Sequence, residues 1–139
     1  MERSKIKVEF NIYSDYIDID NVTKMMGVNP TLTYLKGDPI GNRPIVRKNA
    51  LWAIETDYEE ANGIDEVLPK VFGLIVDKAD IINKVKEQYA AEISIVFVVY
   101  IENGENPGMS LDKDFVKFAA EIDARLDFPI YVFGDFDME

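Results

Sequence analysis

The side chains that most often carry catalysis are missing from this chain. It contains no histidine and no cysteine. The missing imidazole removes the usual general base near neutral pH, the commonest zinc ligand and any Ser-His pair. The missing thiol excludes disulfides, thiolate metal sites and cysteine nucleophiles. Carboxylates, lysines, tyrosines and serines remain, and the sequence predicts a protein that acts by shape and charge rather than by making bonds.

The densest carboxylates near a predicted strand end are Asp15, Asp18 and Asp20. Oxygen ligands of this kind hold hard cations such as calcium. Counting from Asp18, the calcium-loop template requires Asp or Asn and then glycine where the chain has Val22 and Thr23. Capping of the helix that follows explains these carboxylates better. We therefore predict no metal site and no cofactor.

A basic cluster in the middle of the chain is the best candidate for a binding site. Its members surround a loop rich in glycine and proline, and they are Lys36, Arg43, Arg47 and Lys48. Such a patch would bind a phosphate, a carboxylate or an acidic stretch of a partner. Alternatively, these side chains neutralise nearby acids and keep a hairpin edge in solution. Tyr34 and Trp52, on the strands beside the loop, would complete a ligand pocket, although Trp52 is also expected to pack inside.

Alternating or β-rich runs predict the strands that would carry these residues. The predicted strands span residues 5–14, 31–36, 51–56, 93–101 and 128–133. The first alternates apolar and polar residues, which gives one buried face and one face in water. The second and third are expected to pair as a hairpin with a long tip. The fourth is apolar on both faces and is predicted to be central in the sheet.

Four helical segments are predicted between the strands. The first is capped by Asp18 or Asp20 and ends at Gly27. The next two span residues 64–75 and 81–89, and the last begins at a Ser110 cap and reaches Leu126. Pro69 is tolerable only if its helix starts just before it. Residues 134–139 form an acidic end, which we interpret as a frayed tail.

This element order predicts an α+β fold in one domain over residues 1–139. We expect a two-layer sandwich, with a mixed or antiparallel sheet of about five strands and helices on one face. Neither a signal peptide nor an apolar run of the roughly 20 residues that span a bilayer is found, so the expected location is the cytoplasm. With 26 acidic against 15 basic residues, the chain should repel nucleic acid and anionic membranes and attract a basic partner.

Four short motifs stand out, namely residues 26–31 (Met-Gly-Val-Asn-Pro-Thr), residues 36–38 (Lys-Gly-Asp), Trp52 with Thr56, and the closing segment of residues 111–131. Together they resemble a bacterial family known as domain of unknown function 4279. The resemblance covers nearly the whole chain, and its motifs are structural rather than chemical. Residues 40–49 depart from the family pattern in detail. The resemblance implies a small stand-alone bacterial protein with no established activity.

Three hypotheses about function remain open from the sequence. The first is a non-catalytic protein-binding module, and the analogy with small acidic bacterial domains that accompany toxins suggests an immunity protein that neutralises a basic toxin. The second is a sensor that binds a small anionic ligand through the basic cluster. The third is a histidine-free hydrolase or isomerase that uses a pair of carboxylates in a cleft.

Overall fold

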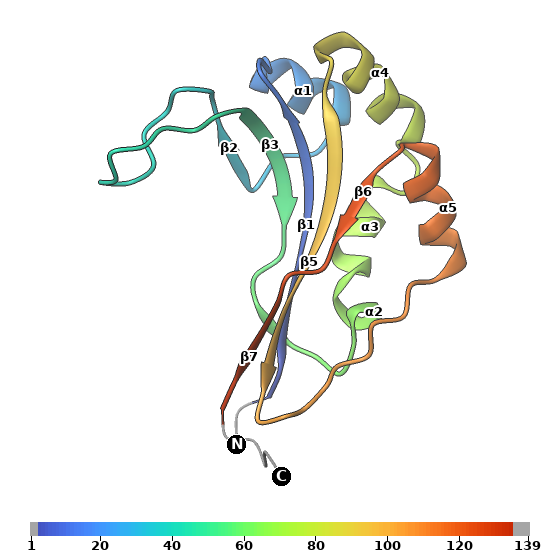
Figure 1. The fold of residues 1–139 in the computed structure, drawn as a ribbon. Coiled ribbons are helices and arrows are strands. Elements are labelled where there is room, and N and C mark those ends of the chain that lie inside the picture. Colours follow the sequence, from blue (N-terminus) through green and yellow to red (C-terminus); the bar gives the residue numbers. More distant parts are fainter. Residues whose placement is uncertain (1–2, 135–139) are drawn as a thin grey trace.

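The computed structural model describes residues 3–134 and shows an α+β fold built on one mixed sheet (Figure 1). In this part of the chain the sheet has seven strands, namely β1 (Lys5–Ser14), β2 (Leu32–Tyr34), β3 (Ala50–Glu55), β4 (Glu59–Glu60), β5 (Glu92–Glu102), β6 (Arg125–Asp127) and β7 (Ile130–Phe133). The helices are α1 (Ile19–Met26), α2 (Ile64–Val67), α3 (Pro69–Ile75), α4 (Ala79–Tyr89) and α5 (Lys113–Glu121).

The strand order across the sheet is β2-β3-β1-β5-β6. The first four strands in this order pair antiparallel, whereas β6 and then β7 pair parallel to β5 along one side of it. The short β4 pairs with the start of β1. As predicted, the strand that is apolar on both faces is internal, because β5 has β1 on one side and β6 and β7 on the other. The predicted hairpin is also confirmed, since Thr33 of β2 lies opposite Trp52 of β3.

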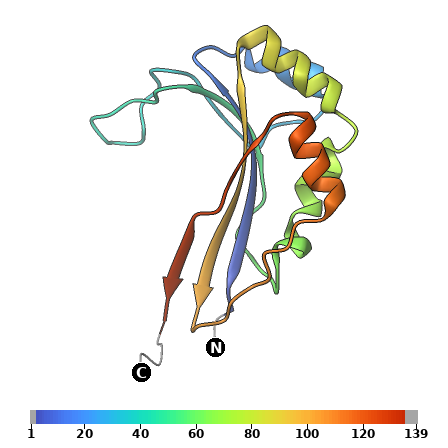
Figure 2. The same ribbon diagram turned by 45° about the vertical axis from the view of Figure 1, so that its right-hand side comes forward.

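All five helices lie on the same side of the sheet (Figures 1 and 2). The long loop between β2 and β3 projects on the opposite side, away from the helices. The arrangement therefore has two layers, and one face of the sheet is left without a helical cover. This open face follows from the alternation in β1, where Lys7 and Glu9 are partly exposed while Val8 and Phe10 are buried.

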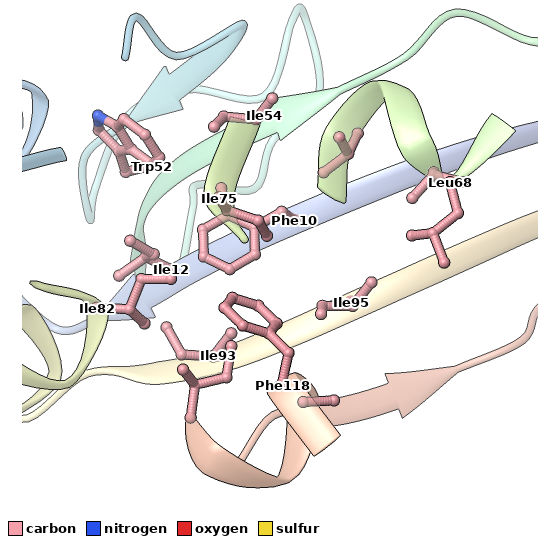
Figure 3. Close-up of a cluster of buried hydrophobic side chains, with 14 of the residues drawn as sticks. Phe10, Ile12, Trp52, Ile54, Leu68, Ile75, Ile82, Ile93, Ile95 and Phe118 are labelled. Carbon is pink, nitrogen blue, oxygen red and sulfur yellow. The ribbon is translucent and has the colours of Figure 1, made fainter. Parts of the chain in front are cut away.

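The hydrophobic core fills the space between the sheet and the helices (Figure 3). Figure 3 shows side chains that come from three strands and from the helices, and those labelled are Phe10, Ile12, Trp52, Ile54, Leu68, Ile75, Ile82, Ile93, Ile95 and Phe118. Trp52 is fully buried, as predicted. Burial of one such large apolar side chain contributes about 1.5–3 kcal/mol to stability. The buried side chains together hold the helices against one face of the sheet and leave its other face uncovered.

The helix ends follow the local sequence. The Asp18 carboxylate accepts a hydrogen bond from the Asn21 backbone N–H at 3.1 Å, which identifies Asp18 as the cap of α1. Gly27 ends this helix in the left-handed conformation, with φ of 68°. Pro69 occupies the first turn of α3, where its missing N–H has no partner to lose, so the predicted segment of residues 64–75 is divided into two helices.

Two predictions near the C-terminus are wrong. The last helix does not reach Leu126, because it ends at Glu121 and the chain turns through Asp123 with φ of 51°, so that Leu126 lies in β6. Asp112, not Ser110, precedes the first helical residue in extended conformation. The strand count was also too low, because β4 and β6 span only two and three residues. The acidic residues 135, 137 and 139 lie outside the described residues.

Candidate functional site

The open face of the sheet carries every second side chain of the long strands. The register places Glu9 between Glu55 of β3 and Val96 of β5, and Asn11 between Ala53 and Ser94. Side chains that lie opposite one another on paired strands share a face. The open face is therefore a surface of mixed polar and apolar side chains that runs across three strands.

A hollow of about 380 Å³ lies on this face, and we call it the central groove. Its lining comes from β1, β2 and β3, from Ser94 of β5, and from Arg47 and Asn49 at the end of the long loop. The central groove is lined by Lys7, Glu9, Asn11, Tyr13, Leu32, Tyr34, Arg47, Asn49, Leu51, Glu55 and Ser94.

One wall of the central groove is an arginine stacked on a tyrosine. The Arg47 guanidinium carbon lies 4.1 Å from the centroid of the Tyr34 ring. The loop is held in place by its own backbone, because Arg47 N–H donates to the Asp38 carbonyl at 2.8 Å and Gly37 N–H donates to the Arg47 carbonyl at 2.9 Å. This ladder turns the Arg47 side chain back over β2. The stacked pair is half-buried and contributes on the order of 1 kcal/mol.

The floor of the central groove is polar and nearly closed to water. The Asn11 side-chain amide donates to the Ser94 hydroxyl at 3.3 Å, and both residues are buried. Beside them, Glu9 and Glu55 lie directly opposite each other on neighbouring strands. The Lys7 ammonium lies 3.4 Å from the Glu9 carboxylate and 3.6 Å from that of Glu55, so it offsets the repulsion between the two carboxylates.

The structure brings together two of the six residues that the sequence suggested for ligand binding, Tyr34 and Arg47. Lys36 is exposed and forms an ion pair with Asp15 at 3.7 Å. Arg43 and Lys48 are exposed along the loop and do not line the central groove. Trp52 lies in the core, on the other side of the sheet, and its indole N–H donates to the Thr23 hydroxyl at 2.9 Å.

A second feature of the open face, at the opposite end of β1 and β5, is a cluster of rings that we call the tyrosine patch. It consists of Tyr58, Tyr100, Tyr131 and Phe133. Tyr100 is at its centre. The centroid of its ring lies 4.9 Å from that of Tyr58, 5.0 Å from that of Tyr131 and 5.4 Å from that of Phe133. Tyr58, Tyr131 and Phe133 are exposed. A hollow of about 370 Å³ between the rings is also lined by Lys5 and Glu102.

The tyrosine patch has a shared hydrogen bond that changes the acidity of one phenol. The hydroxyls of Tyr58 and Tyr100 are 3.5 Å apart. This hydrogen bond, followed by burial and by the electrostatic effect of the neighbouring Tyr100 phenol, raises the pKa of Tyr58 to about 12. Tyr58 also has the Lys7 ammonium 5.3 Å from its ring centroid, which connects the patch to the ion pairs of the central groove.

The tyrosine patch was not identified as a unit from the sequence. Its members come from the segment after β3, from β5 and from β7, and only the sheet register brings them together. The available signal was the last predicted strand, in which all four residues of Ile130–Phe133 are apolar or aromatic. A strand of that kind has a large side chain on each face, even where one face is open.

The three aspartates considered as cation ligands have separate roles. Asp18 caps α1, Asp15 pairs with Lys36, and Asp20 lies in the first helical turn. Within residues 3–134, no group of three carboxylates is close enough to hold a metal ion. Nor does any helix in this range combine the length and the apolar character needed to cross a bilayer.

Comparison with known proteins gives one match. Residues 4–133 match the family described as domain of unknown function 4279. The chain belongs to this family. No curated protein and no solved structure matches the chain. The match of this member of domain of unknown function 4279 includes both the central groove and the tyrosine patch, and the family description assigns no activity to either.

Proposed function

We propose that this member of domain of unknown function 4279 is a non-catalytic binding module that docks a basic protein partner on the open face of its sheet. An immunity protein that neutralises a basic toxin in the cytoplasm is one form of such a module. The observation that carries the proposal is the tyrosine patch, in which three large rings remain exposed on a face without helices. Tyrosine and other aromatic side chains are enriched among the residues that dominate binding energy at protein interfaces.

The charge of the molecule supports a basic partner. The net charge is −11, and acidic residues flank the patch, since Glu60 of β4 lies opposite Lys5 of β1 and Glu102 lines the ring hollow. A field of this sign speeds the diffusional encounter with a basic protein and fixes its orientation. The rings would then supply most of the affinity once the two surfaces exclude water.

A pull-down from the source organism tests this proposal. The immobilised protein should recover a basic protein at about 50 mM salt and lose most of it at about 500 mM, because salt screens steering between exposed charges. The variant Tyr58→Ser removes one exposed ring of the patch and should weaken capture about tenfold or more. Tyr16→Ser is the matched control, because Tyr16 is a more exposed tyrosine outside the patch. Recovery of no partner, or equal loss with both variants, would contradict the proposal.

A specific observation favours a second candidate, the binding of a small anion in the central groove. Arg47 is the groove cation that forms no ion pair among the described residues, whereas Lys7 is held between two carboxylates. A guanidinium with the Asn11 amide nearby is suited to a carboxylate or a phosphate. In a thermal-shift screen, small carboxylates or phosphates should raise the melting temperatures of the wild type and of Lys48→Ala but not that of Arg47→Ala. Stabilisation that survives Arg47→Ala would reject this candidate.

A further inference from the structure

The strand β7 forms the outer edge of the sheet beyond β5. In residues 3–134 it pairs with β5 alone, and its other side pairs with no strand. Figures 1 and 2 show it at the end of the sheet away from α4 and α5, with no helix beside its outer edge. An edge strand offers a row of unpaired N–H and C=O groups that can pair with another strand.

The ladder to β5 identifies which backbone groups of β7 point outward. The carbonyls of Pro129 and Phe133 accept hydrogen bonds from Val99 and Asn103, so they point toward β5 and its continuation. Because hydrogen-bonding direction alternates along a strand, the N–H and C=O groups of Ile130 and Val132 point away from the sheet. Ile130 and Val132 thus supply the unpaired backbone groups of this edge.

Among residues 3–134, none of the features that usually protect an edge strand lies at this edge. Ile130, Tyr131, Val132 and Phe133 carry no charge, and each is 46–55% exposed. Lysine, inward-pointing charges or a covering helix normally block pairing at such a place. The opposite edge of the sheet differs, because the exposed, basic loop with Lys36, Arg43 and Lys48 follows β2 directly.

We propose that β7 pairs antiparallel with β7 of a second copy of this chain, which makes a two-fold dimer with one continuous sheet. In the register centred on Tyr131, Ile130 of each copy lies opposite Val132 of the other. The outward N–H and C=O groups of these residues then make four hydrogen bonds, so none of them is left unpaired. The two Tyr131 side chains face each other across the axis on the open face, and the two tyrosine patches become one surface.

A second copy fits this edge better than a foreign basic protein. The four residues of β7 carry no charge, and an identical strand supplies the same length, the same alternation and the same apolar side chains. Two-fold interfaces are self-complementary in this way. The side chains of β7 are about half exposed, so pairing would remove part of their apolar surface from water. A four-residue edge is small compared with a standard interface, so we expect a weak, reversible dimer.

Cysteine cross-linking tests the register directly, because the chain contains no cysteine of its own. In the proposed register Tyr131 faces its counterpart at a non-hydrogen-bonded position, where the Cα atoms are about 4.5 Å apart, a distance that a disulfide spans. Tyr131→Cys should therefore give a covalent dimer under mild oxidation. Lys48→Cys, which also lies at an exposed position but on the long loop, should stay monomeric. Equal cross-linking of the two variants would overturn the proposal.

Sedimentation over about 1 μM to 1 mM protein supplies the second measurement. The wild type should show a reversible monomer–dimer equilibrium. Val132→Pro removes an outward N–H without touching the ladder to β5 and should weaken the dimer about tenfold or more, whereas Val132→Thr keeps the N–H and should change it much less. A wild type that is monomeric throughout, or a dimer unaffected by Val132→Pro, would overturn the proposal. Neither readout involves the basic partner proposed above, so the two proposals fail separately.

Discussion

Trp52 was both a binding candidate and an expected core residue by sequence, and its surroundings settle which role it has. Its indole is fully buried, and its N–H donates to the Thr23 hydroxyl of α1. A buried donor left without a partner costs about 1–3 kcal/mol. This hydrogen bond therefore fixes α1 against β3, the strand that carries Leu51 and Glu55 into the central groove on its other face.

We expect Thr23→Val to destabilise the protein by about 1–3 kcal/mol, because valine keeps the shape of threonine but leaves the indole N–H unpaired. Urea unfolding followed by the fluorescence of the single tryptophan would measure this loss. In a Trp52→Phe background, followed by circular dichroism, the same substitution should cost much less, since the donor is gone. An equal cost in both backgrounds would show that the Thr23 hydroxyl matters for another reason.

The raised pKa of Tyr58 predicts a loss of stability at high pH. In the unfolded chain its phenol ionises near 10.0, whereas in the folded protein the hydrogen bond with Tyr100 raises the pKa to about 12. Between these values the unfolded state releases the proton first, so the free energy of unfolding decreases as the pH rises from about 10 to 12. Below pH 10 this contribution is fully present.

Denaturation curves at several pH values from about 9 to 12 would test this. Tyr58→Phe cannot ionise, so its stability should fall less steeply than that of the wild type over this interval. Tyr16→Phe, which removes an exposed tyrosine elsewhere, controls for the loss of a phenol. If Tyr58→Phe and the wild type lost stability in parallel, the hydrogen bond in the tyrosine patch would not be the cause of the shift.

At the scale of elements, the sequence correctly predicted the strands and helices that have a clear periodic pattern. Alternation in β1 and the capped helix from Asp18 to Gly27 are local patterns, and the structure confirms both. The errors lie where a pattern is short or ambiguous. Leu126 is four residues beyond Ile122, which fits a helical stripe, yet Asp123 turns the chain first. The two-residue β4 has no local pattern, because its pairing with β1 depends on tertiary contacts.

The candidate site shows the same division. The basic loop was visible in the sequence. Of its four basic residues only Arg47 lines the central groove, and its orientation depends on backbone hydrogen bonds between the two sides of the loop. The tyrosine patch depends on the register of β7 against β5, which pairs Tyr131 with Tyr100. Sequence separation hides such contacts, since each strand by itself carries apolar residues on both faces.

The C-terminal ends of α1 and α4 allow a paired prediction about stability. Gly27 ends α1 and Ala90 ends α4, and both adopt left-handed backbone angles, with φ of 68° and 49°. This conformation costs an L-residue about 1 kcal/mol that glycine avoids. We expect Gly27→Ala to destabilise the protein by about 1 kcal/mol and Ala90→Gly to stabilise it by up to about 1 kcal/mol.

Thermal unfolding of the two variants would check the pair. A Cβ atom at Gly27 would meet only the Lys78 ammonium, at 4.0 Å, so a loss in Gly27→Ala would reflect the backbone and not a clash. Gly73→Ala gives the opposite control, because Gly73 lies inside α3 with open space around a Cβ atom and should be stabilised by alanine. Destabilisation by Ala90→Gly would mean that lost helix propensity outweighs the relief of strain.

At the scale of the whole molecule, the excess of acidic residues acts on stability as well as on partners. The net charge is −11, and the ion pairs found in residues 3–134 involve side chains that are partly or largely exposed to solvent. Exposed pairs of this kind contribute at most about 1 kcal/mol each. Long-range repulsion among the remaining carboxylates should therefore exceed the attraction within the pairs.

Added salt should consequently stabilise this protein. Raising the ionic strength from about 10 mM to 150 mM shortens the screening length from about 30 to 8 Å, which weakens distant repulsion more than close attraction. We expect the melting temperature to rise by a few degrees, about 2–8 °C for a gain near 1 kcal/mol. A fall in melting temperature would show instead that the ion pairs dominate.

The double variant Glu87→Gln, Glu121→Gln separates repulsion from other effects of salt. These exposed carboxylates lie near the C-terminal ends of α4 and α5, where the helix dipole also disfavours negative charge. Their removal changes the net charge from −11 to −9, so the variant should melt higher than the wild type at low salt and gain less from added salt. If salt raised the melting temperature of the variant as much as that of the wild type, the stabilisation would not depend on the charge of the protein. It would then reflect weak ion binding or solvent effects.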